Sequence, residues 1–368
     1  MVILNPQKLD LNKIMKSKNL IKNSIKKLNA YVPGEQVLDE DIIKLNTNEN
    51  PYLPSPDVQD ILSMIDISKL SRYPDPNCIE LRKVIAELHN CNFNQVFVGN
   101  GSDEILALSI RAYLEKDESL GYLNPSYSLY PVLADIENIN KIPITLNDSF
   151  IWDGKYNKLI KLLILTNPNA PTGISLTNDQ INNLLDNFKG ILLIDEAYAD
   201  FSNKNFLHLI NDYSNVIISR SLSKSYSLAG IRCGYCLGDK DLIEALYKIK
   251  DSYNIDYITQ EIARVAILDQ NTMKANVQAI RETRVILNEK LIEFGFNVFP
   301  SDTNFIWFKP VGISAEILFE KLRKKNILLR YFNNSDLTKD FLRVTVGTAP
   351  EVFKLIDAIK EIISGDIE

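Results

Sequence analysis

The sequence predicts an α/β protein: a large domain with a mostly parallel sheet between helices, followed by a smaller α+β domain. From about residue 95, apolar runs of strand length alternate with helix-length segments, which is typical of a parallel sheet flanked by helices. This alternation stops near residue 270, and the 368 residues exceed the usual size of one compact core. We expect an N-terminal arm that joins the small domain (1–48), a large domain (49–270) and a small domain (271–368).

The predicted strands of the large domain all end in polar loops rich in Gly, Pro or Asn. In open α/β sheets ligands bind beyond the carboxyl ends of the strands, so these loops are expected to form one site. In chain order the runs are "QVFVGNG" before the helix "SDEILALSIRAYLE", "ESLGYLNP" before "SYSLYPVLADIENI", "KLLILTNPNAPTG" before "TNDQINNLLDNF", and then "GILLIDEAYADF", "NVIISRSLSKS" and "IRCGYCLG".

The two ends of the chain are organised differently. Residues 1–50 contain helical and loop pieces, broken at "AYVPGEQ", and the lysines between Lys13 and Lys27 are expected on a solvated, amphipathic helix. The mixed order of strands and helices after residue 270 favours an α+β domain. Its predicted elements are the helix "NTMKANVQAIRETRVILNEKLIEFG", the strand "TNFIWFKP", the helix "SAEILFEKLRKKN", and the strands "ILLRYF" and "FLRVTVGT".

Composition excludes several classes of function. The net charge of −6 argues against nucleic-acid binding, which needs clustered positive charge. No apolar stretch approaches a membrane span or a signal-peptide core, so we expect a cytoplasmic protein with no membrane partner. Cys233 and Cys236 form a C-x-x-C pair, but a zinc site needs further ligands and the chain has only His89 and His208. We therefore expect no metal.

The stretch "SLSKSYSLAGIRCGY", residues 221–235, places a lysine just after a predicted strand. A lysine in an apolar pocket is partly desolvated, and its neutral amine can attack an aldehyde. Ser221, Ser223 and Arg232 offer hydroxyl groups and a guanidinium that suit a phosphate. "GNGSDE" at 99–104 adds a glycine turn and a helix N-terminus that attracts anions. Alone, Lys224 could equally be a solvated surface lysine; its neighbours favour a reactive amine beside a phosphate.

"DEAYADF" follows another predicted strand and begins with an acid at the strand's end. Asp195 could be a helix or turn cap. Its other interpretation is a partner for a protonated ring nitrogen, as in pyridoxal phosphate. Tyr198 and Asn167 could then contact the phenolate oxygen of that cofactor, and Tyr127 could stack on its ring.

"TNPNAPTG", "DEAYADF" and "SLSKSYSLAGIRCGY", in this order, resemble the class I/II aminotransferases with the aspartate-aminotransferase fold. The closer likeness is to the histidinol-phosphate aminotransferase family, and it extends from about Tyr31 to Gly347. The motifs that carry it are "KLNTNENPYLPSP", "RYPDP", "GNGSDE", "DSYNID", "SDTNFIWF", "ILLRYF" and "FLRVTVGT".

The resemblance implies a homodimer in which residues 49–270 form a domain that binds pyridoxal 5'-phosphate. It implies that Lys224, Asp195 and Tyr198 are catalytic. It implies that Lys224 is the covalent attachment point of the cofactor, that Asp195 lies at the ring nitrogen, and that Tyr198 and Asn167 lie at the phenolate oxygen. The residues that it implies at the phosphate are Ser221, Ser223, Arg232, the amides of Gly101, Ser102 and Asp103, and Tyr73 of the other subunit. The implied substrate residues are Asn48, Asn167, Arg330, Arg343 and, from the other subunit, Tyr31.

The activity that the resemblance implies is amino-group transfer between L-histidinol phosphate and 2-oxoglutarate or glutamate, in histidine biosynthesis. A transaminase for another small phosphorylated amine or ketone, such as serinol phosphate or dihydroxyacetone phosphate, fits the same motifs. So does a decarboxylase such as threonine-phosphate decarboxylase. A dinucleotide-dependent oxidoreductase is disfavoured, because Glu104 stands where the glycine fingerprint needs a third small residue. A regulator would need a DNA-binding module, and the sequence contains none.

Overall fold

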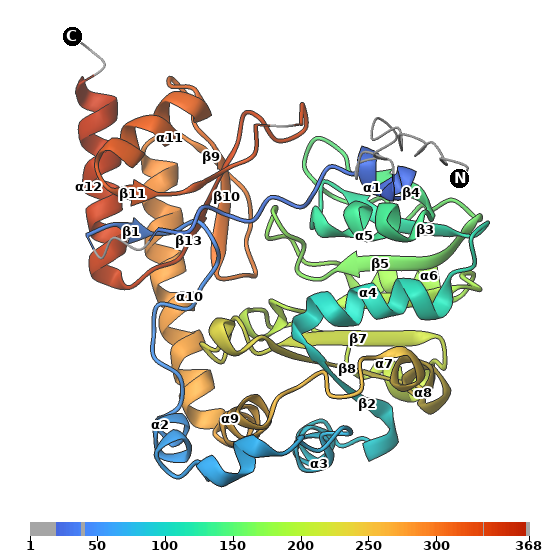
Figure 1. The fold of residues 1–368 in the computed structure, drawn as a ribbon. Helices are drawn as coiled ribbons and strands as arrows, with labels where there is room; N and C mark the ends of the chain where they lie inside the picture. The colour runs from blue at the N-terminus through green and yellow to red at the C-terminus, as the bar shows by residue number, and fades with distance from the viewer. Residues whose placement is uncertain (1–19, 38–40, 334, 366–368) are drawn as a thin grey trace, which may run out of the picture.

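The computed structural model describes residues 20–37, 41–333 and 335–365, and it confirms the predicted fold class (Figure 1). A seven-stranded sheet with helices forms the larger part, and a small antiparallel sheet lies in the other. Helix α10 (Gln270–Glu293) runs from one part to the other. Of the predicted lysine-containing helix, residues 13–19 lie outside the described residues. The described portion contains α1 (Asn23–Lys27), which buries no residue.

The seven-stranded sheet has the order β2-β8-β7-β6-β5-β3-β4, and only β8 runs antiparallel to its neighbours. Its central strands are continuous apolar runs, as expected for strands that are covered on both faces. The strands are β2 (Val96–Asn100), β3 (Ser119–Asn124), β4 (Asn140–Thr145), β5 (Ile160–Thr166), β6 (Ile191–Asp195), β7 (Val216–Ser221) and β8 (Cys233–Gly238).

Two groups of buried apolar residues cover the two faces of this sheet. Cys233 packs in one group and Cys236 in the other, so the C-x-x-C thiols face opposite sides; both are free, and burial raises the pKa of each. The helical segments around the sheet are α2 (Pro56–Ser63), η3 (Ile67–Ser71), α3 (Ile79–Leu88), η4 (Phe93–Gln95), α4 (Gly101–Tyr113), α5 (Leu129–Glu137), α6 (Asn178–Leu185), η5 (Ala199–Phe201), α7 (Leu209–Asp212), η6 (Ala229–Ile231), α8 (Lys240–Ile249) and α9 (Tyr257–Leu268).

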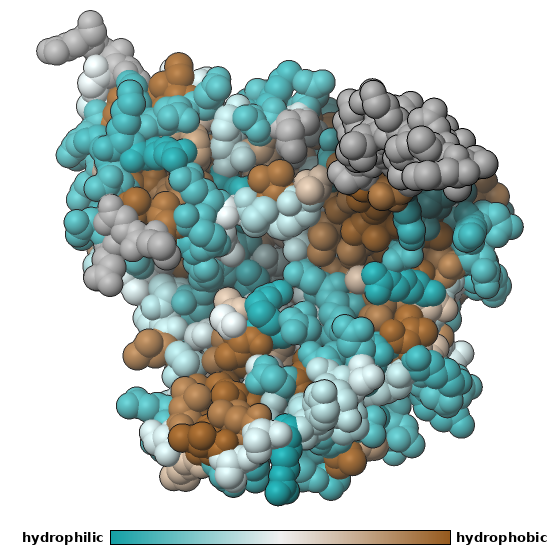
Figure 2. Space-filling view, viewed as in Figure 1, coloured by the Kyte–Doolittle hydropathy of each residue, from teal (hydrophilic) through white to brown (hydrophobic). Residues whose placement is uncertain are grey.

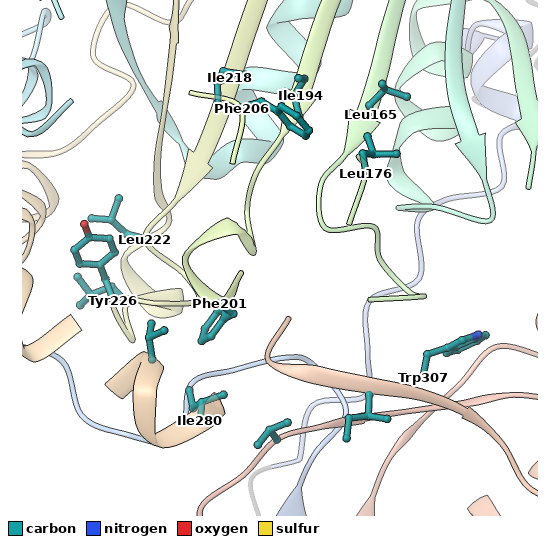
Figure 3. Close-up of a cluster of buried hydrophobic side chains, with 14 of the residues drawn as sticks. Leu165, Leu176, Ile194, Phe201, Phe206, Ile218, Leu222, Tyr226, Ile280 and Trp307 are labelled. Atoms are coloured by element: carbon teal, nitrogen blue, oxygen red, sulfur yellow. The ribbon is translucent and has the colours of Figure 1, made fainter. Parts of the chain in front are cut away.

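One of these groups continues into the C-terminal part of the molecule. Ile218 of β7, Ile280 of α10 and Trp307 belong to the same buried cluster (Figure 3). The large sheet, the long helix and the small sheet are therefore packed against one another, which fixes the loops of one part relative to the strands of the other.

The C-terminal part contains a four-stranded antiparallel sheet of order β12-β13-β10-β9. A separate parallel pair joins β1, from near the N-terminus, to β11. The N-terminal segment thereby reaches the C-terminal part before the chain enters the large sheet (Figure 1). The elements are β1 (Ile43–Lys44), β9 (Asn297–Val298), β10 (Phe305–Lys309), α11 (Ala315–Lys324), β11 (Ile327–Leu328), β12 (Arg330–Tyr331), β13 (Leu342–Thr345) and α12 (Ala349–Gly365).

The structure differs from the predicted elements in two places. Strand β4, at the edge of the large sheet, was not among the predicted strands; it contains Pro143 and none of its residues is buried. The predicted single strand "ILLRYF" is two short strands, β11 and β12, which pair in different sheets. None of the helices in the described ranges has both the length and the apolar character needed to cross a membrane.

Candidate active site

A cavity of about 230 Å³ lies at the carboxyl ends of the parallel strands, where the loops were predicted to meet. Most of the predicted site residues line it. They are Tyr31, Asn48, Ser102, Asp103, Tyr127, Asp195, Tyr198, Ser221, Ser223, Lys224, Arg232, Arg330 and Arg343. Three predicted residues do not line it: Gly101 lies beside Arg232, Asn167 is buried behind the wall, and Tyr73 is on the surface.

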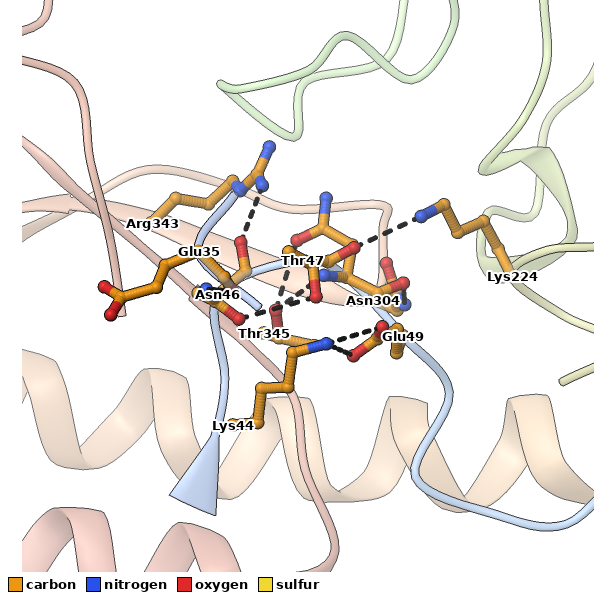
Figure 4. A network of polar contacts seen from close by, with 10 residues as sticks. Glu35, Lys44, Asn46, Thr47, Glu49, Lys224, Asn304, Arg343 and Thr345 are labelled. Atoms are coloured by element: carbon orange, nitrogen blue, oxygen red, sulfur yellow. Dashed lines mark hydrogen bonds and ion pairs between the residues drawn. The ribbon is translucent and has the colours of Figure 1, made fainter. Parts of the chain in front are cut away.

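Lys224 lies in the loop after β7, and its side chain points toward the N-terminal segment (Figure 4). Its Nζ donates to the carbonyl oxygen of Thr47 at 3.3 Å and lies 5.7 Å from the ring centre of Tyr198. Asn50 Nδ2 donates to the carbonyl oxygen of Lys224 at 2.9 Å. Among the described residues, Lys224 Nζ has no ion-pair partner. The amine is thus held near the cavity by a neutral carbonyl that a stronger partner can replace.

Asp195 ends β6 and is almost fully buried. Its Oδ2 accepts a hydrogen bond from Tyr130 Oη at 2.9 Å, and its Oδ1 accepts from Ser219 Oγ at 3.2 Å and from the amide of Ala197 at 3.3 Å. Burial raises the pKa of Asp195 to about 6, although these three donors act in the opposite direction. No ion pair to Asp195 occurs within the described ranges. The carboxylate is therefore suited to a cationic partner.

Tyr198 and Asn167 lie on loops that follow neighbouring strands. Asn48 Nδ2 donates to Tyr198 Oη at 2.9 Å, which connects the N-terminal segment to the loop after β6. Asn167 Oδ1 accepts from the amide of Leu176 at 2.9 Å, while its buried Nδ2 has no partner in the part of the chain that the structure describes. A buried donor without an acceptor is costly, so this amide group favours an oxygen-bearing ligand.

An anion-binding site, which we call the anion seat, lies at the N-terminus of α4. The helix has no side-chain cap, so its first amides remain available to a ligand. Arg232 Nη2 is 3.1 Å from Asp103 Oδ2, and its Nη1 donates to Ser223 Oγ at 3.3 Å. A side chain at Gly101 would place its Cβ 2.7 Å from Arg232 Nη2, so glycine is needed for this approach. The seat combines helix amides, a guanidinium and hydroxyl groups, which suit a phosphate.

Arg330 and Arg343 are cross-strand partners on β12 and β13. Arg343 is half-buried, its Nη2 donates to the carbonyl oxygen of Asn46 at 3.1 Å, and its buried Nε has no partner among the described residues. Arg330 donates to the carbonyl oxygens of Val32 and Pro33 at 3.1 and 3.3 Å. Neither guanidinium pairs with an acid of the described residues, so neither arginine is part of a surface ion pair there. Two adjacent cations without counter-charge form a second anion site.

Tyr31 and Tyr73 occupy very different positions. Tyr31 lines the cavity of its own chain, with its ring 5.7 Å from that of Tyr127, and its contribution to the site of another subunit stays a prediction. Arg330 donates to the carbonyl oxygens of Val32 and Pro33, which places the segment that follows Tyr31 beside β12. Tyr73 is 80% exposed and stacks on Tyr253, away from its own cavity.

The groups in this cavity fit pyridoxal phosphate. That cofactor presents a ring nitrogen, a phenolate oxygen, an aldehyde and a phosphate. The cavity is lined by an amine at Lys224 and by a buried carboxylate at Asp195 that has no cation among the described residues. Next to these groups are the uncapped N-terminus of α4 and the buried amide donor of Asn167, which has no partner in the described part of the chain. No group of three or more potential metal-ligating side chains occurs in the described portion of the chain.

Several residues of the site were not found from the sequence. Thr47 and Asn46 supply carbonyl groups to Lys224 and Arg343, and a backbone contact has no signature in residue type. Tyr130 and Ser219 support Asp195. They had a usable signal: Tyr130 follows Tyr127 by three residues, in the first turn of α5, and Ser219 lies next to Asp195 in the parallel register of β6 and β7.

This chain is similar to known proteins in sequence and in structure. Residues 40–359 match the family model "Aminotransferase class I and II". A histidinol-phosphate aminotransferase of Brachyspira hyodysenteriae is 42% identical over 352 residues, which cover 94% of this chain and 99% of the relative.

Two solved structures have the same fold. Histidinol-phosphate aminotransferase of Sinorhizobium meliloti, in complex with pyridoxal-5'-phosphate, has a TM-score of 0.82 at 22% identity and covers 94% of this chain and 98% of its own. L-threonine-O-3-phosphate decarboxylase of Porphyromonas gingivalis has a TM-score of 0.79 at 20% identity, covering 88% of this chain and 100% of its own.

Proposed function

This chain belongs to the class I and II aminotransferases and is a pyridoxal-phosphate-dependent transaminase, and from that premise we propose that it moves an amino group between L-histidinol phosphate and 2-oxoglutarate. The observation that carries the choice of substrate is the pair Arg330 and Arg343, because it forms an anion site additional to the seat at α4. One seat suits the cofactor's phosphate, and the other suits a phosphate or carboxylate on the substrate.

We propose that the cofactor is held by the residues predicted from the sequence. Asp195 holds a proton on the ring nitrogen, Asn167 Nδ2 and Tyr198 Oη contact the phenolate oxygen, and Tyr127 lies against the ring. Ser221, Ser223, Arg232 and the first amides of α4 hold the phosphate, with Gly101 allowing Arg232 to approach. When bound, pyridoxal phosphate supplies an electron sink that stabilises negative charge at the substrate's Cα.

Lys224 is proposed as the covalent attachment point and as the base that moves the proton at the substrate's Cα. The chain has two histidines, and neither His89 nor His208 lines the cavity, so the amine is the basic group nearest to this task. Both half-reactions use the same pocket, which predicts ping-pong kinetics.

Arg343 and Arg330 orient the substrate, together with Tyr31 and Asn48. A guanidinium binds carboxylate and phosphate with the same two-pronged geometry, so one pair of arginines can serve both the phosphorylated donor and the dicarboxylic acceptor. Partial burial of Arg343 lowers its pKa and reduces the competition from water, which strengthens its attraction for an anion.

We also propose that the protein is a homodimer and that it is cytoplasmic. Large apolar side chains are exposed around α2 and η3, among them Leu53, Met64 and Ile67, and Figure 2 shows brown surface where α2 is drawn in Figure 1. A contiguous exposed apolar patch is typical of a protein interface. Tyr73 follows this segment, and its exposed side chain supports a contact with a neighbouring subunit. All four cysteines are free, in keeping with a reducing compartment.

The test is single-turnover mixing of the purified, cofactor-loaded protein with histidinol phosphate. We expect the visible absorbance of the lysine-bound cofactor to disappear without added 2-oxoglutarate and to return when 2-oxoglutarate is added. Lys224→Ala should lack the absorbance and turnover, whereas the exposed Lys248→Ala should keep both.

Three outcomes of this experiment would contradict the proposal. An absorbance that persists with histidinol phosphate but is lost with glutamate points to another phosphorylated acceptor or donor, such as the serinol phosphate pair. Release of CO2 without dependence on 2-oxoglutarate identifies a decarboxylase. Retained absorbance in Lys224→Ala removes the lysine from the site.

A further inference from the structure

A buried group of charges lies behind the cavity wall. Arg220, on β7, pairs through Nη2 with Glu196 Oε2 at 2.7 Å and through Nη1 with Asp200 Oδ1 at 2.8 Å. The side chain of Glu196 is completely buried, that of Arg220 is 8% exposed and that of Asp200 is 24% exposed. We call these three residues the buried ion triad. None of them lines the cavity, so they take no direct part in binding.

The buried ion triad is rigidly anchored. Burial raises the pKa of Glu196, although Arg220 acts to lower it, and the amide of Phe206 donates to Glu196 Oε1 at 2.6 Å. Removing one member of such a group leaves an uncompensated buried charge, so the three side chains hold one another in place. Glu196 and Asp200 flank Tyr198 on the loop after β6, and Arg220 precedes Ser221.

A side-chain hydrogen bond connects the triad to the loop that carries Lys224. Ser225 Oγ donates to Asp200 Oδ2 at 2.5 Å, and Ser225 is almost fully buried. On the other side, Asn50 Nδ2 donates to the carbonyl oxygens of Lys224 and Ser225 at 2.9 and 3.2 Å. The backbone at Lys224 is thus held from two directions, and the charged contact comes from Asp200.

We propose that Asp200 is a positioning residue for Lys224: it fixes the lysine-bearing loop through Ser225, while Arg220 and Glu196 fix Asp200. The inference rests on the assignment of Lys224 under the proposed function. An amine that forms a covalent bond and then moves a proton must return to one place, and functional side chains need placement to within about 0.5 Å. The same triad holds the loop of Asp195 and Tyr198, so it sets the two loops at a fixed separation.

Ser225→Ala is the sharpest test, because it removes the connection and leaves the triad intact. Ser227→Ala is a matched control: Ser227 is in the same loop, and its buried Oγ has no hydrogen-bond partner among the described residues. Since a hydrogen bond to a charged group is at stake, we expect kcat of Ser225→Ala to fall about tenfold with KM unchanged. The pH midpoint of the cofactor's visible band should also shift, whereas Ser227→Ala should match the wild type in both measurements.

Asp200→Asn provides a second, independent arm. Asparagine keeps the size and one acceptor oxygen but removes the charge, so it should lower kcat and shift the band in the same direction as Ser225→Ala. If Asp200 acts through Ser225, the double variant should be no worse than Asp200→Asn alone.

The outcomes separate this inference from the proposed function. If Lys224→Ala loses the cofactor band but Ser225→Ala behaves like Ser227→Ala, the positioning role is wrong and the proposed function stands. If the effects of Ser225→Ala and Asp200→Asn on kcat add fully in the double variant, Asp200 does not act through Ser225, and the inference is again wrong. If Lys224→Ala keeps the band, both are overturned.

Discussion

At the scale of single residues, Asp195 has the environment that most constrains the chemistry. A carboxylate at the end of a buried strand loses hydration, and here three hydrogen bonds only partly replace it. Its pKa is raised to about 6, so the folded, cofactor-free protein binds a proton there more tightly than the unfolded chain does. A cationic ring nitrogen beside it would relieve this cost.

A pH-dependent stability follows for the cofactor-free protein. Between the ordinary pKa of 3.8 and the folded value of about 6, the folded state binds more protons than the unfolded state, so the free energy of unfolding falls as pH rises. The decrease is about 3 kcal/mol. We expect Asp195→Asn to lose this decrease in denaturant titrations from pH 4 to 7 (roughly the window of the two values). The exposed Asp117→Asn should keep it, and identical slopes for Asp195→Asn and wild type would refute the prediction.

Which site residues could be predicted depends on where their signal lies. Asp195 and Lys224 were predictable because each follows a recognisable strand, and parallel strands bring their carboxyl ends together. The contacts that Thr47 and Asn48 make could not be predicted. They join the N-terminal segment to Lys224 and Tyr198, which lie 177 and 150 positions further along the chain. Such pairings depend on how the two parts of the molecule dock, which local periodicity does not contain.

At the scale of elements, the close contact between β8 and the start of α4 shapes the anion seat. Gly234 of β8 lies against the backbone of the helix: a Cβ there would be 2.6 Å from the amide nitrogen of Ser102 and 2.8 Å from the carbonyl carbon of Gly101. Because backbone atoms cannot rotate away, the helix N-terminus would have to move.

We therefore expect Gly234→Ala to weaken binding of pyridoxal phosphate by about tenfold or more, because displaced amides no longer converge on the phosphate. The measurement is cofactor dissociation followed by absorbance. Gly230→Ala is the matched control, since a Cβ at Gly230 meets no atom within 4 Å. Equal affinities for the two variants would show that the seat tolerates the shift.

The elements most readily predicted were those with strong apolar periodicity, such as β5 and β6, whose residues are nearly all buried. Strand β4 was not predicted, because an edge strand needs no continuous apolar run and because Pro143 lowers its strand signal. The division of "ILLRYF" into β11 and β12 follows from partners that lie elsewhere in the chain, β1 and β13.

At the scale of the whole molecule, the cavity is assembled from three distant parts of the chain. The large sheet supplies Asp195 and Lys224, the small sheet supplies Arg330 and Arg343, and the N-terminal segment supplies Tyr31 and the carbonyl groups beside it. The shared apolar core and α10 hold the two sheets together (Figure 3). The position of Tyr73 suggests a fourth contribution, from another subunit, because it is exposed and lies outside its own cavity.

Mixed dimers test that fourth contribution. Lys224→Ala and Tyr73→Ala homodimers each have two defective sites. In a mixed dimer, the chain with an intact Lys224 receives an intact Tyr73 from its partner, so one of the two sites is whole. Equal mixing with random pairing should therefore restore about a quarter of the sites. If Tyr73 instead served its own chain, every site in the mixed dimer would carry a defect, and activity after co-expression would not exceed the average of the two parents.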